Sequence, residues 1–333
     1  MPLPLLFIAA GAATTLFGLN KSTQAKKDRD DALIINSEAH VIIENASYKM
    51  EECRINCESA IHNFGKMKVR ILDGSIKPFI KEFEKIAHVE LTKNNELNES
   101  ENIFLDEKSY DELKKSQSLA SSLADGLISG TAVGALTAFG AYSAVGSLAT
   151  ASTGTAISAL SGAAATNATL AFLGGGSMAV GGLGIAGGTA VLGGLITGPA
   201  LAIMGTIIAK SASEDKNNAS INLQKAQDYC AEVDQASLVC INIRKRANIM
   251  SRLLVRLDTV FQPLVYQLKQ IIKEKGVECS KYSKEEQDVV AEVLSIAGLI
   301  NTLVNTPILD KKGNLTKESD KKAAEAILFL GKV

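Results

Sequence analysis

The sequence predicts an all-α protein: a long antiparallel coiled coil or helical bundle with a central Gly/Ala-rich hydrophobic helical hairpin and an apolar N-terminal helix. Apolar residues recur at alternating three- and four-residue spacings along two long stretches, and no stretch alternates with the two-residue period of a strand. Between those stretches, residues 126–209 contain no charged residue and no His. All 35 Lys and Arg and all 36 Asp and Glu residues of the 333-residue chain therefore lie elsewhere.

Residues 1–20 are the first expected element, an apolar N-terminal anchor helix. They carry no charged residue, and the lysines and arginine that follow begin at Lys21. A secretory signal has its positive charge before the apolar run, whereas here the charge comes after it. By the positive-inside rule this order predicts a protein of the bacterial inner membrane with the bulk of the chain cytoplasmic. The alternative is an apolar first helix packed in a bundle.

Residues 21–92 are expected to form a long coiled-coil helical arm, which Gly74 and Pro78 end or kink. Residues 93–125 are expected to be a linker and a short helix, opened by a capping box of Ser109 and Glu112. The seam of the arm consists of apolar or small residues three or four positions apart: Ile35, Ala39, Ile42, Ala46, Met50, Cys53, Cys57, Ala60, Phe64, Met67 and Ile71.

Residues 210–275 are expected to be a second coiled-coil helix that returns alongside the first, with a kink at Pro263. Residues 276–333 are expected to be shorter C-terminal helices, one opened by a capping box of Ser283 and Glu286 and the last begun by Thr316. The seam of the returning helix is formed by Cys240, Ile243, Ala247, Met250, Leu254, Leu257, Phe261, Leu264, Leu268 and Ile271.

Residues 126–209 are interpreted as a glycine-zipper segment that inserts into a membrane with two or four crossings. The segment holds 19 of the 27 glycines, and four-residue spacing puts small residues on one helix face, where backbones can approach closely. Glycines with this spacing are Gly126, Gly130, Gly134, Gly184, Gly188, Gly194 and Gly198. Polar residues suited to a pore lining or a hairpin tip are Thr150, Thr153, Thr166, Asn167 and Thr169.

The weak hydrophobicity of this segment predicts conditional insertion. Leu, Ile, Phe and Val each favour insertion by about 0.3 to 0.6 kcal/mol, but the segment relies mainly on Gly, Ala and Thr. It is therefore expected to stay packed in an oligomer or bundle until conditions change, so that the protein is soluble before activation. The alternative is a permanently buried Ala/Gly hairpin in the core of a soluble protein.

The search for chemistry predicts no enzyme, no cofactor and no metal site. Residues 182–187 match G-x-G-x-x-G, but no strand pattern precedes them. Cys53, Cys57 and His62 could approach one another on a helix, but both thiols lie on the seam, where a small buried Cys is ordinary. The net charge of -1 excludes a general nucleic-acid binder.

One basic cluster is a candidate site for an anionic ligand. It consists of Arg244, Lys245, Arg246, Arg252 and Arg256. These side chains flank the seam and could pair with acidic residues of a neighbouring helix, which is the common structural use of such positions. The alternative is binding of a nucleotide or oligonucleotide phosphate, or of anionic lipid headgroups.

Three resemblances bear on function. Residues 148–177, LATASTGTAISALSGAAATNATLAFLGGGS, and the opening MPLPL resemble a group of mostly uncharacterised bacterial glycine-zipper membrane proteins. Long helices on both sides of one apolar insert resemble the plan of α-helical pore-forming toxins of the cytolysin A type. The chain is also similar to channel effectors of anti-phage systems such as Hailong, in which a nucleic-acid ligand silences a toxic channel. That similarity implies a ligand site in the basic cluster.

Together these observations predict an oligomeric membrane protein that forms a pore or ion channel and acts as a toxic effector in antiviral defence. Its expected partners are the lipid bilayer, further copies of itself as a homo-oligomer, and a regulatory nucleotide or short oligonucleotide, with no small-molecule substrate. The alternative is a non-enzymatic coiled-coil scaffold, membrane-anchored or soluble, whose hydrophobic hairpin is a buried core.

Overall fold

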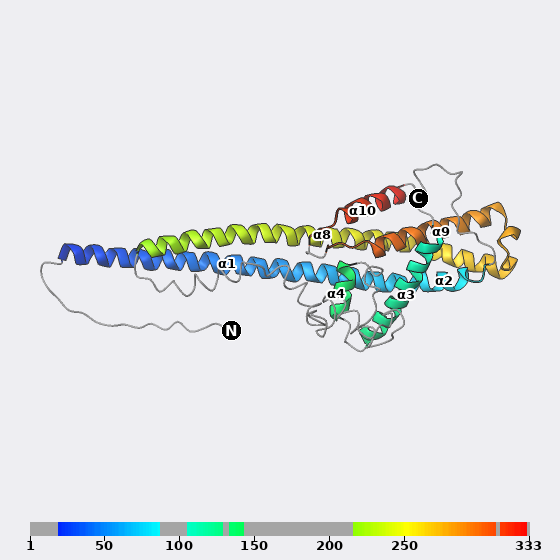
Figure 1. Cartoon of the computed structure of the whole chain (residues 1–333), viewed down its shortest axis with the longest axis horizontal. Helices are drawn as coiled ribbons and strands as arrows, with labels where there is room; N and C mark the ends of the chain where they lie inside the picture. The colour runs from blue at the N-terminus through cyan, green and yellow to red at the C-terminus, as the bar shows by residue number, and fades with distance from the viewer. Residues whose placement is uncertain (1–18, 87–104, 129–132, 143–215, 311–313, 332–333) are drawn as a thin grey trace. The chain divides into compact units, whose positions relative to one another are not determined.

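The computed structural model describes residues 19–86, 105–128, 133–142, 216–310 and 314–331 (Figure 1). Within these residues the only β-structure is one antiparallel bridge between Leu309 and Leu315, and the all-α class is confirmed. The elements are α1 (Leu19–Ile71), the π-helical turn η1 (Leu72–Ile76), α2 (Lys77–Phe83), α3 (Glu107–Ile128), α4 (Val133–Ala141), α8 (Lys216–Lys275), the 3-10 turn η4 (Cys279–Lys281), α9 (Lys284–Asn305) and α10 (Lys317–Leu330).

The chain divides into two compact units, and the first contains the described residues 19–49 and 216–235. In this unit α1 and α8 run parallel, because their contacts advance along both helices in the same direction. The Asn222 amide donates to the Asn36 carbonyl oxygen at 3.0 Å, and the Lys49 ammonium contacts the Asp234 carboxylate at 2.8 Å. Between these two contacts, the Ser47 and Tyr229 hydroxyls lie 3.2 Å apart.

The second unit contains α1 from Met50, α8 from Ala236, and all the other elements. Here too α1 and α8 are parallel: Ser237 donates to the Met50 sulfur, and further along both helices Gln262 donates to Ser75. The antiparallel expectation is therefore wrong. A heptad seam has the same period in either direction, and residues 72–215, which separate the two helices, are long enough for a parallel connection.

The core of the second unit is built from large apolar side chains. Phe79 packs edge-on against Phe261, with ring centroids 5.6 Å apart, and Phe83 packs in the same way against Tyr110 at 5.5 Å. The expected seam lies largely inside this core, since Phe64, Leu254, Leu257 and Leu268 are fully buried together with most other seam residues.

The π-helical turn η1 and a proline of α8 lie at the same level. The π-helical turn η1 contains Gly74 and ends just before Pro78, which lies in the first turn of α2. Gly74 and Pro78 were expected to end or kink the first arm; α1 ends before them, at Ile71, and the chain continues through η1 into α2. Pro263 lies inside α8, one residue after Gln262, which contacts Ser75 of η1.

The helix caps were predicted with mixed success. Ser283 and Glu286 form the expected capping box of α9, and Thr316 caps α10. The box at Ser109 is wrong, because α3 begins at Glu107 and Asp106 accepts the hydrogen bond from the Ser109 backbone at 2.8 Å. Asp is as good an N-cap as Ser, so the helix starts at the earlier of two adjacent signals.

One described helix, α9, is long and apolar enough to cross a membrane, by length and composition. Its most apolar 18-residue window has a mean hydropathy of 1.4 and is 61% buried inside the protein. A core helix of a soluble bundle passes the same test, and the burial of Ile296, Leu299 and Leu303 fits that role.

Candidate functional site

The site follows from how α4, the first helix that lies wholly in the uncharged segment 126–209, packs on α1. Two glycines face each other where these helices cross. A Cβ on Gly65 would overlap the backbone carbonyl of Leu136, and a Cβ on Gly140 would overlap that of Ile61. The two backbones are therefore in direct contact, which only glycine permits at both positions.

Lys68 closes the C-terminal end of α4. Its ammonium donates to the carbonyl oxygens of Phe139 at 2.8 Å and Tyr142 at 3.2 Å, and it lies 4.6 Å from the centroid of the Phe64 ring. The last carbonyls of a helix have no partner within the helix, and the negative end of its dipole favours a cation. Lys68 supplies a hydrogen-bond donor at this end.

Further contacts hold the same end of α4 from the segment after α9. The Ala141 carbonyl accepts hydrogen bonds from the backbone N–H groups of Ile308 at 2.9 Å and Leu309 at 3.1 Å. On the α1 side, His62 Nδ1 lies 3.2 Å from the Thr137 hydroxyl. We call this set of contacts around α4 the α4 dock.

The α4 dock places a basic group in a fully buried position. Lys68 has no exposed surface, and burial lowers its pKa to about 7 because the charged form loses its hydration. A lysine in solution titrates near 10.5, so this group changes its charge state in the neutral range. The energy of the dock is thereby coupled to pH.

The predicted glycines are only partly within the described residues. Gly126 lies in α3 and Gly134 in α4. Gly130, Gly184, Gly188, Gly194 and Gly198 fall outside the described residues, as do Thr150, Thr153, Thr166, Asn167 and Thr169.

Sequence analysis missed the residues that form the α4 dock. Gly140 lies six residues after Gly134 and so outside the four-residue repeat. Lys68 lies beside the seam, where a charged residue usually faces solvent. One signal was present: Gly65 is the only glycine in the long stretch of α1, where glycine is unfavourable without a packing reason.

The predicted basic cluster lies on α8. Arg246 forms an ion pair with Asp320 of α10, which is the structural use expected for such positions. Burial lowers the pKa of Arg246. Arg252 Nε donates to the carbonyl of Asn248 at 3.2 Å. The Arg246 Nε atom is buried without a hydrogen-bond partner. Arg244 is half-buried, and Lys245 and Arg256 are exposed.

The thiols and histidine considered for a metal do not form a ligand set in the described ranges, where no group of three His, Cys, Asp or Glu side chains converges. Cys57 is buried beside Cys240 of α8, and a hydrogen bond between these thiols together with burial raises the pKa of Cys57. Comparisons with protein-family models, curated proteins and solved structures found no match.

Proposed function

We propose that this protein is a membrane-active, oligomeric effector whose uncharged segment 126–209 enters the bilayer and permeabilises it, and that the α4 dock holds the segment in the inactive state. The observation that carries the proposal is the pairing of an 84-residue stretch without charge with a dedicated dock on its first helix. The three resemblances given above point to the same class of protein.

The composition of the dock supports release rather than permanent burial. Close glycine contacts favour association of helices in water and in lipid alike, so the same surface of α4 can pack on α1 or on another copy of the segment. Lys68 has no ion-pair partner among the residues that the structure describes, and it is fully buried, which makes its protonated form expensive to bury. Both features favour a dock that can be released.

The second candidate function is a scaffold in which segment 126–209 is a permanent core element. The burial of Leu136, Phe139 and Ala141 of α4 favours it, since a soluble bundle would bury the same residues. The two candidates differ in one respect: only the membrane effector needs α4 to leave α1.

The experiment compares the same protein with α4 joined to α1 by a disulfide and with α4 free to leave α1. His62→Cys combined with Thr137→Cys places two thiols where side chains already meet, so that mild oxidation joins α4 to α1. Purified protein is added to dye-loaded vesicles of bacterial lipid composition. We expect the reduced protein to release dye, the oxidised protein to release at least about tenfold less, and reductant to restore release.

The single variants His62→Cys and Thr137→Cys are the matched controls, because they undergo the same oxidation of native cysteines as the double variant but cannot join position 62 to position 137. In cells, strong expression is expected to collapse the membrane potential, and Gly130→Leu with Gly134→Leu to prevent this. A reduced wild type that stays wholly soluble and releases no dye supports the scaffold and contradicts the effector.

A further inference from the structure

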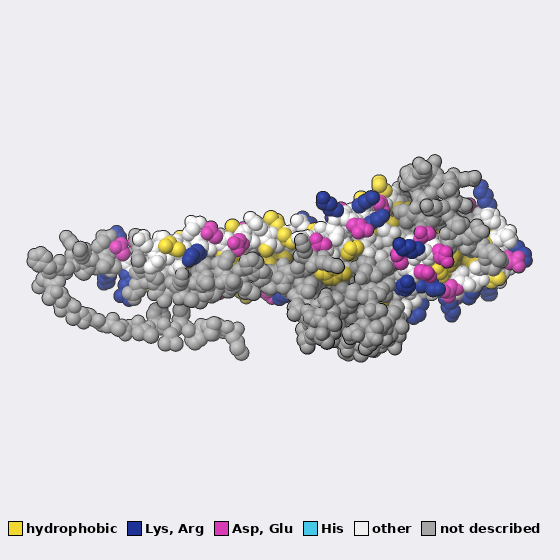
Figure 2. Space-filling view, viewed as in Figure 1, with side chains coloured by type: hydrophobic (Ala, Val, Ile, Leu, Met, Phe, Trp, Pro, Cys, Tyr) yellow, Lys and Arg dark blue, Asp and Glu magenta, His cyan; other side chains and the backbone are white. Residues whose placement is uncertain are grey.

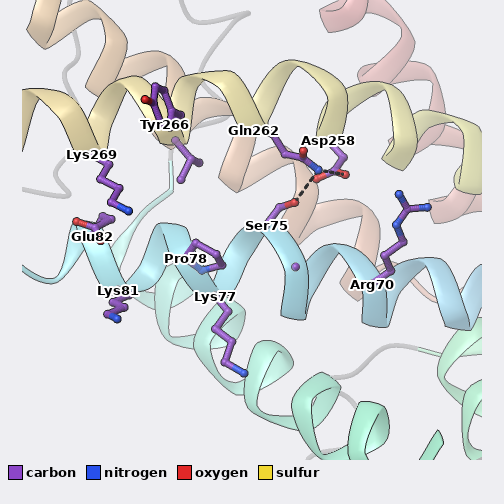
Figure 3. A pocket seen from close by; sticks show the side chains of 12 residues that line it. Arg70, Ser75, Lys77, Pro78, Lys81, Glu82, Asp258, Gln262, Tyr266 and Lys269 are labelled. Atoms are coloured by element: carbon purple, nitrogen blue, oxygen red, sulfur yellow. Dashed lines mark hydrogen bonds between the residues drawn. The ribbon is translucent and has the colours of Figure 1, made fainter. Parts of the chain in front are cut away.

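A groove separates η1 and α2 from the facing part of α8 within the second unit (Figure 3). Its volume is about 620 Å³, and it adjoins a second hollow of about 510 Å³ that shares Arg70, Asp258 and Gln262 with it. The π-helical turn η1 and Pro263 of α8 both lie at this level, and π-helical turns often accompany functional sites. Volumes of this size suit a small-molecule ligand.

A buried carboxylate forms the polar floor of the groove. Asp258 is 9% exposed, and its Oδ2 atom accepts a hydrogen bond from Gln262 Nε2 at 2.9 Å. The same nitrogen donates to the Ser75 hydroxyl at 3.2 Å (Figure 3). The second carboxylate oxygen, Oδ1, is buried and has no hydrogen-bond partner among the described residues. A buried charged acceptor without a donor is costly, which indicates that a ligand supplies the missing N–H or O–H group.

Two cations without partners lie along the groove. Figure 3 shows Arg70 extending from α1 toward α8 and Lys269 extending from α8 toward Glu82, whereas Lys77 and Lys81 point away from α8. Lys77 forms an ion pair with Asp73 at 2.9 Å, but in the part of the chain that the structure describes Arg70 and Lys269 form none. Figure 2 shows basic and acidic side chains mixed over the region of α2 and the end of α8.

We propose that this groove binds a phosphate that carries a primary ammonium a few atoms away, the chemistry of phosphoethanolamine. The ammonium donates to Asp258 Oδ1, and the Arg70 guanidinium holds the phosphate through paired N–H groups. The exposed ring of Tyr266 and the neighbouring Val265 offer an apolar side wall for the carbon atoms of the ligand.

The requirement for an N–H donor sets the specificity of the site. A choline group has the same charge as an ethanolamine group but no N–H, so it would leave Asp258 Oδ1 without a donor and would crowd the floor with methyl groups. Sites with a buried polar group to satisfy reject such analogues strongly. Phosphocholine is therefore the discriminating competitor.

The same chemistry comes from two sources: free O-phosphoethanolamine and the headgroup of phosphatidylethanolamine. The lipid source rests on the proposed membrane function. The full-length protein is titrated with O-phosphoethanolamine and with phosphocholine by calorimetry, and it is floated with vesicles that contain phosphatidylethanolamine or phosphatidylcholine over the same anionic lipid. Binding in the calorimetric arm alone assigns a soluble ligand, and binding in the flotation arm alone assigns the lipid headgroup.

We expect the ethanolamine form to bind at least about tenfold more tightly than the choline form in one arm or both. Asp258→Asn is expected to remove this preference. Arg70→Gln is expected to weaken the binding of both the ethanolamine and the choline form. Arg70 is exposed, so Arg70→Gln is expected to fold normally. It therefore still tests the proposal if Asp258→Asn fails to fold. Lys66→Gln, which removes an exposed cation of α1 outside the groove, is the matched control and is expected to bind normally.

Absence of an ethanolamine preference in both arms overturns the proposal, as does a preference that persists in Asp258→Asn or normal binding by Arg70→Gln. Neither arm measures leakage. A wild type that binds the ethanolamine form but releases no dye would therefore contradict the proposed function and leave this inference standing.

Discussion

The two units of the chain pair the same two helices with very different side chains. In the first unit, most buried residues of α1 and α8 are small or polar, namely Ala32, Asn36, Ala39, Ala46, Ala219, Asn222 and Ala226, and the larger ones are Ile43, Tyr229 and Val233. In the second unit, the same helices bury Phe64, Ile71, Met250, Leu254, Leu257 and Phe261. A fully buried Leu or Phe contributes about 1.5 to 3 kcal/mol and an Ala far less.

This difference indicates that the two units contribute differently to the pairing of α1 and α8, one mainly to its stability and the other mainly to its register. The second unit supplies most of the folding free energy, because α2, α3, α9 and α10 add to its core. The first unit supplies register, since Asn36 and Asn222 can make their buried hydrogen bond only when these residues lie opposite each other. Three sets of substitutions test this division.

The largest effect is expected at the α4 dock in the second unit. Gly65→Ala adds a Cβ that overlaps the backbone of Leu136, and backbone cannot move aside as a flexible side chain would. We expect a loss of about 3 kcal/mol in the free energy of unfolding of the second unit, with increased hydrogen exchange in α4. Chemical denaturation and exchange measurements provide the readouts.

Gly74→Ala is the matched control, because a Cβ at Gly74 of η1 meets nothing within 4 Å. The same substitution there is expected to be neutral or to stabilise the protein by up to about 1 kcal/mol, since Ala favours helix over Gly. Equal effects at positions 65 and 74 would show that α4 does not pack directly on α1.

An intermediate effect is expected from pH, through Lys68. Between pH 7 and 10.5 the folded protein holds Lys68 neutral while the unfolded chain protonates it, so the stability due to this group rises with pH and is lost as pH falls toward 7. One unit of pH is worth at most about 1.4 kcal/mol, so we expect a gain of about 2 kcal/mol from pH 7 to pH 9. Denaturation at both pH values measures it.

The control for Lys68→Met is Lys66→Met, which removes an exposed lysine two residues earlier on α1. Lys68→Met is expected to flatten the dependence on pH, and Lys66→Met to leave it as in the wild type. If both variants keep the wild-type slope, Lys68 does not titrate in this range.

The smallest effect is expected in the first unit. Asn36→Ala removes the buried hydrogen bond that Asn222 donates to α1 and is expected to cost about 1 to 2 kcal/mol, seen as faster exchange along residues 26–49. Asn45→Ala, on the exposed side of α1, is the control. Asn36→Leu with Asn222→Leu is expected to restore stability while relaxing register. An Asn36→Ala variant indistinguishable from Asn45→Ala would argue against the register role.

The sequence predicted features that depend on local chemistry. The heptad spacing located both long helices and most buried positions, because one apolar face per helix is a property of the helix itself. The caps at Ser283 and Thr316 and the interruption at Gly74 and Pro78 follow from neighbouring residues in the same way.

Contacts between residues that lie far apart in the chain could not be predicted from the sequence. The parallel direction of α1 and α8 leaves no trace in a heptad pattern. Lys68 is buried only because the end of α4 reaches it from 71 residues away, and Asp258 faces Ser75 across a separation in sequence that no spacing rule covers. The breakers Gly74 and Pro263 were visible, but nothing local indicates that they lie opposite each other.

The parallel arrangement of α1 and α8 has a consequence for synthesis of the chain. Asn222 follows its partner Asn36 by 186 residues, so α1 is complete long before the helix that covers its seam leaves the ribosome. At about 5 to 20 residues per second, that delay is about 10 to 40 s. During this time the apolar face of α1 is without α8, which predicts strong dependence on chaperones while the nascent chain grows.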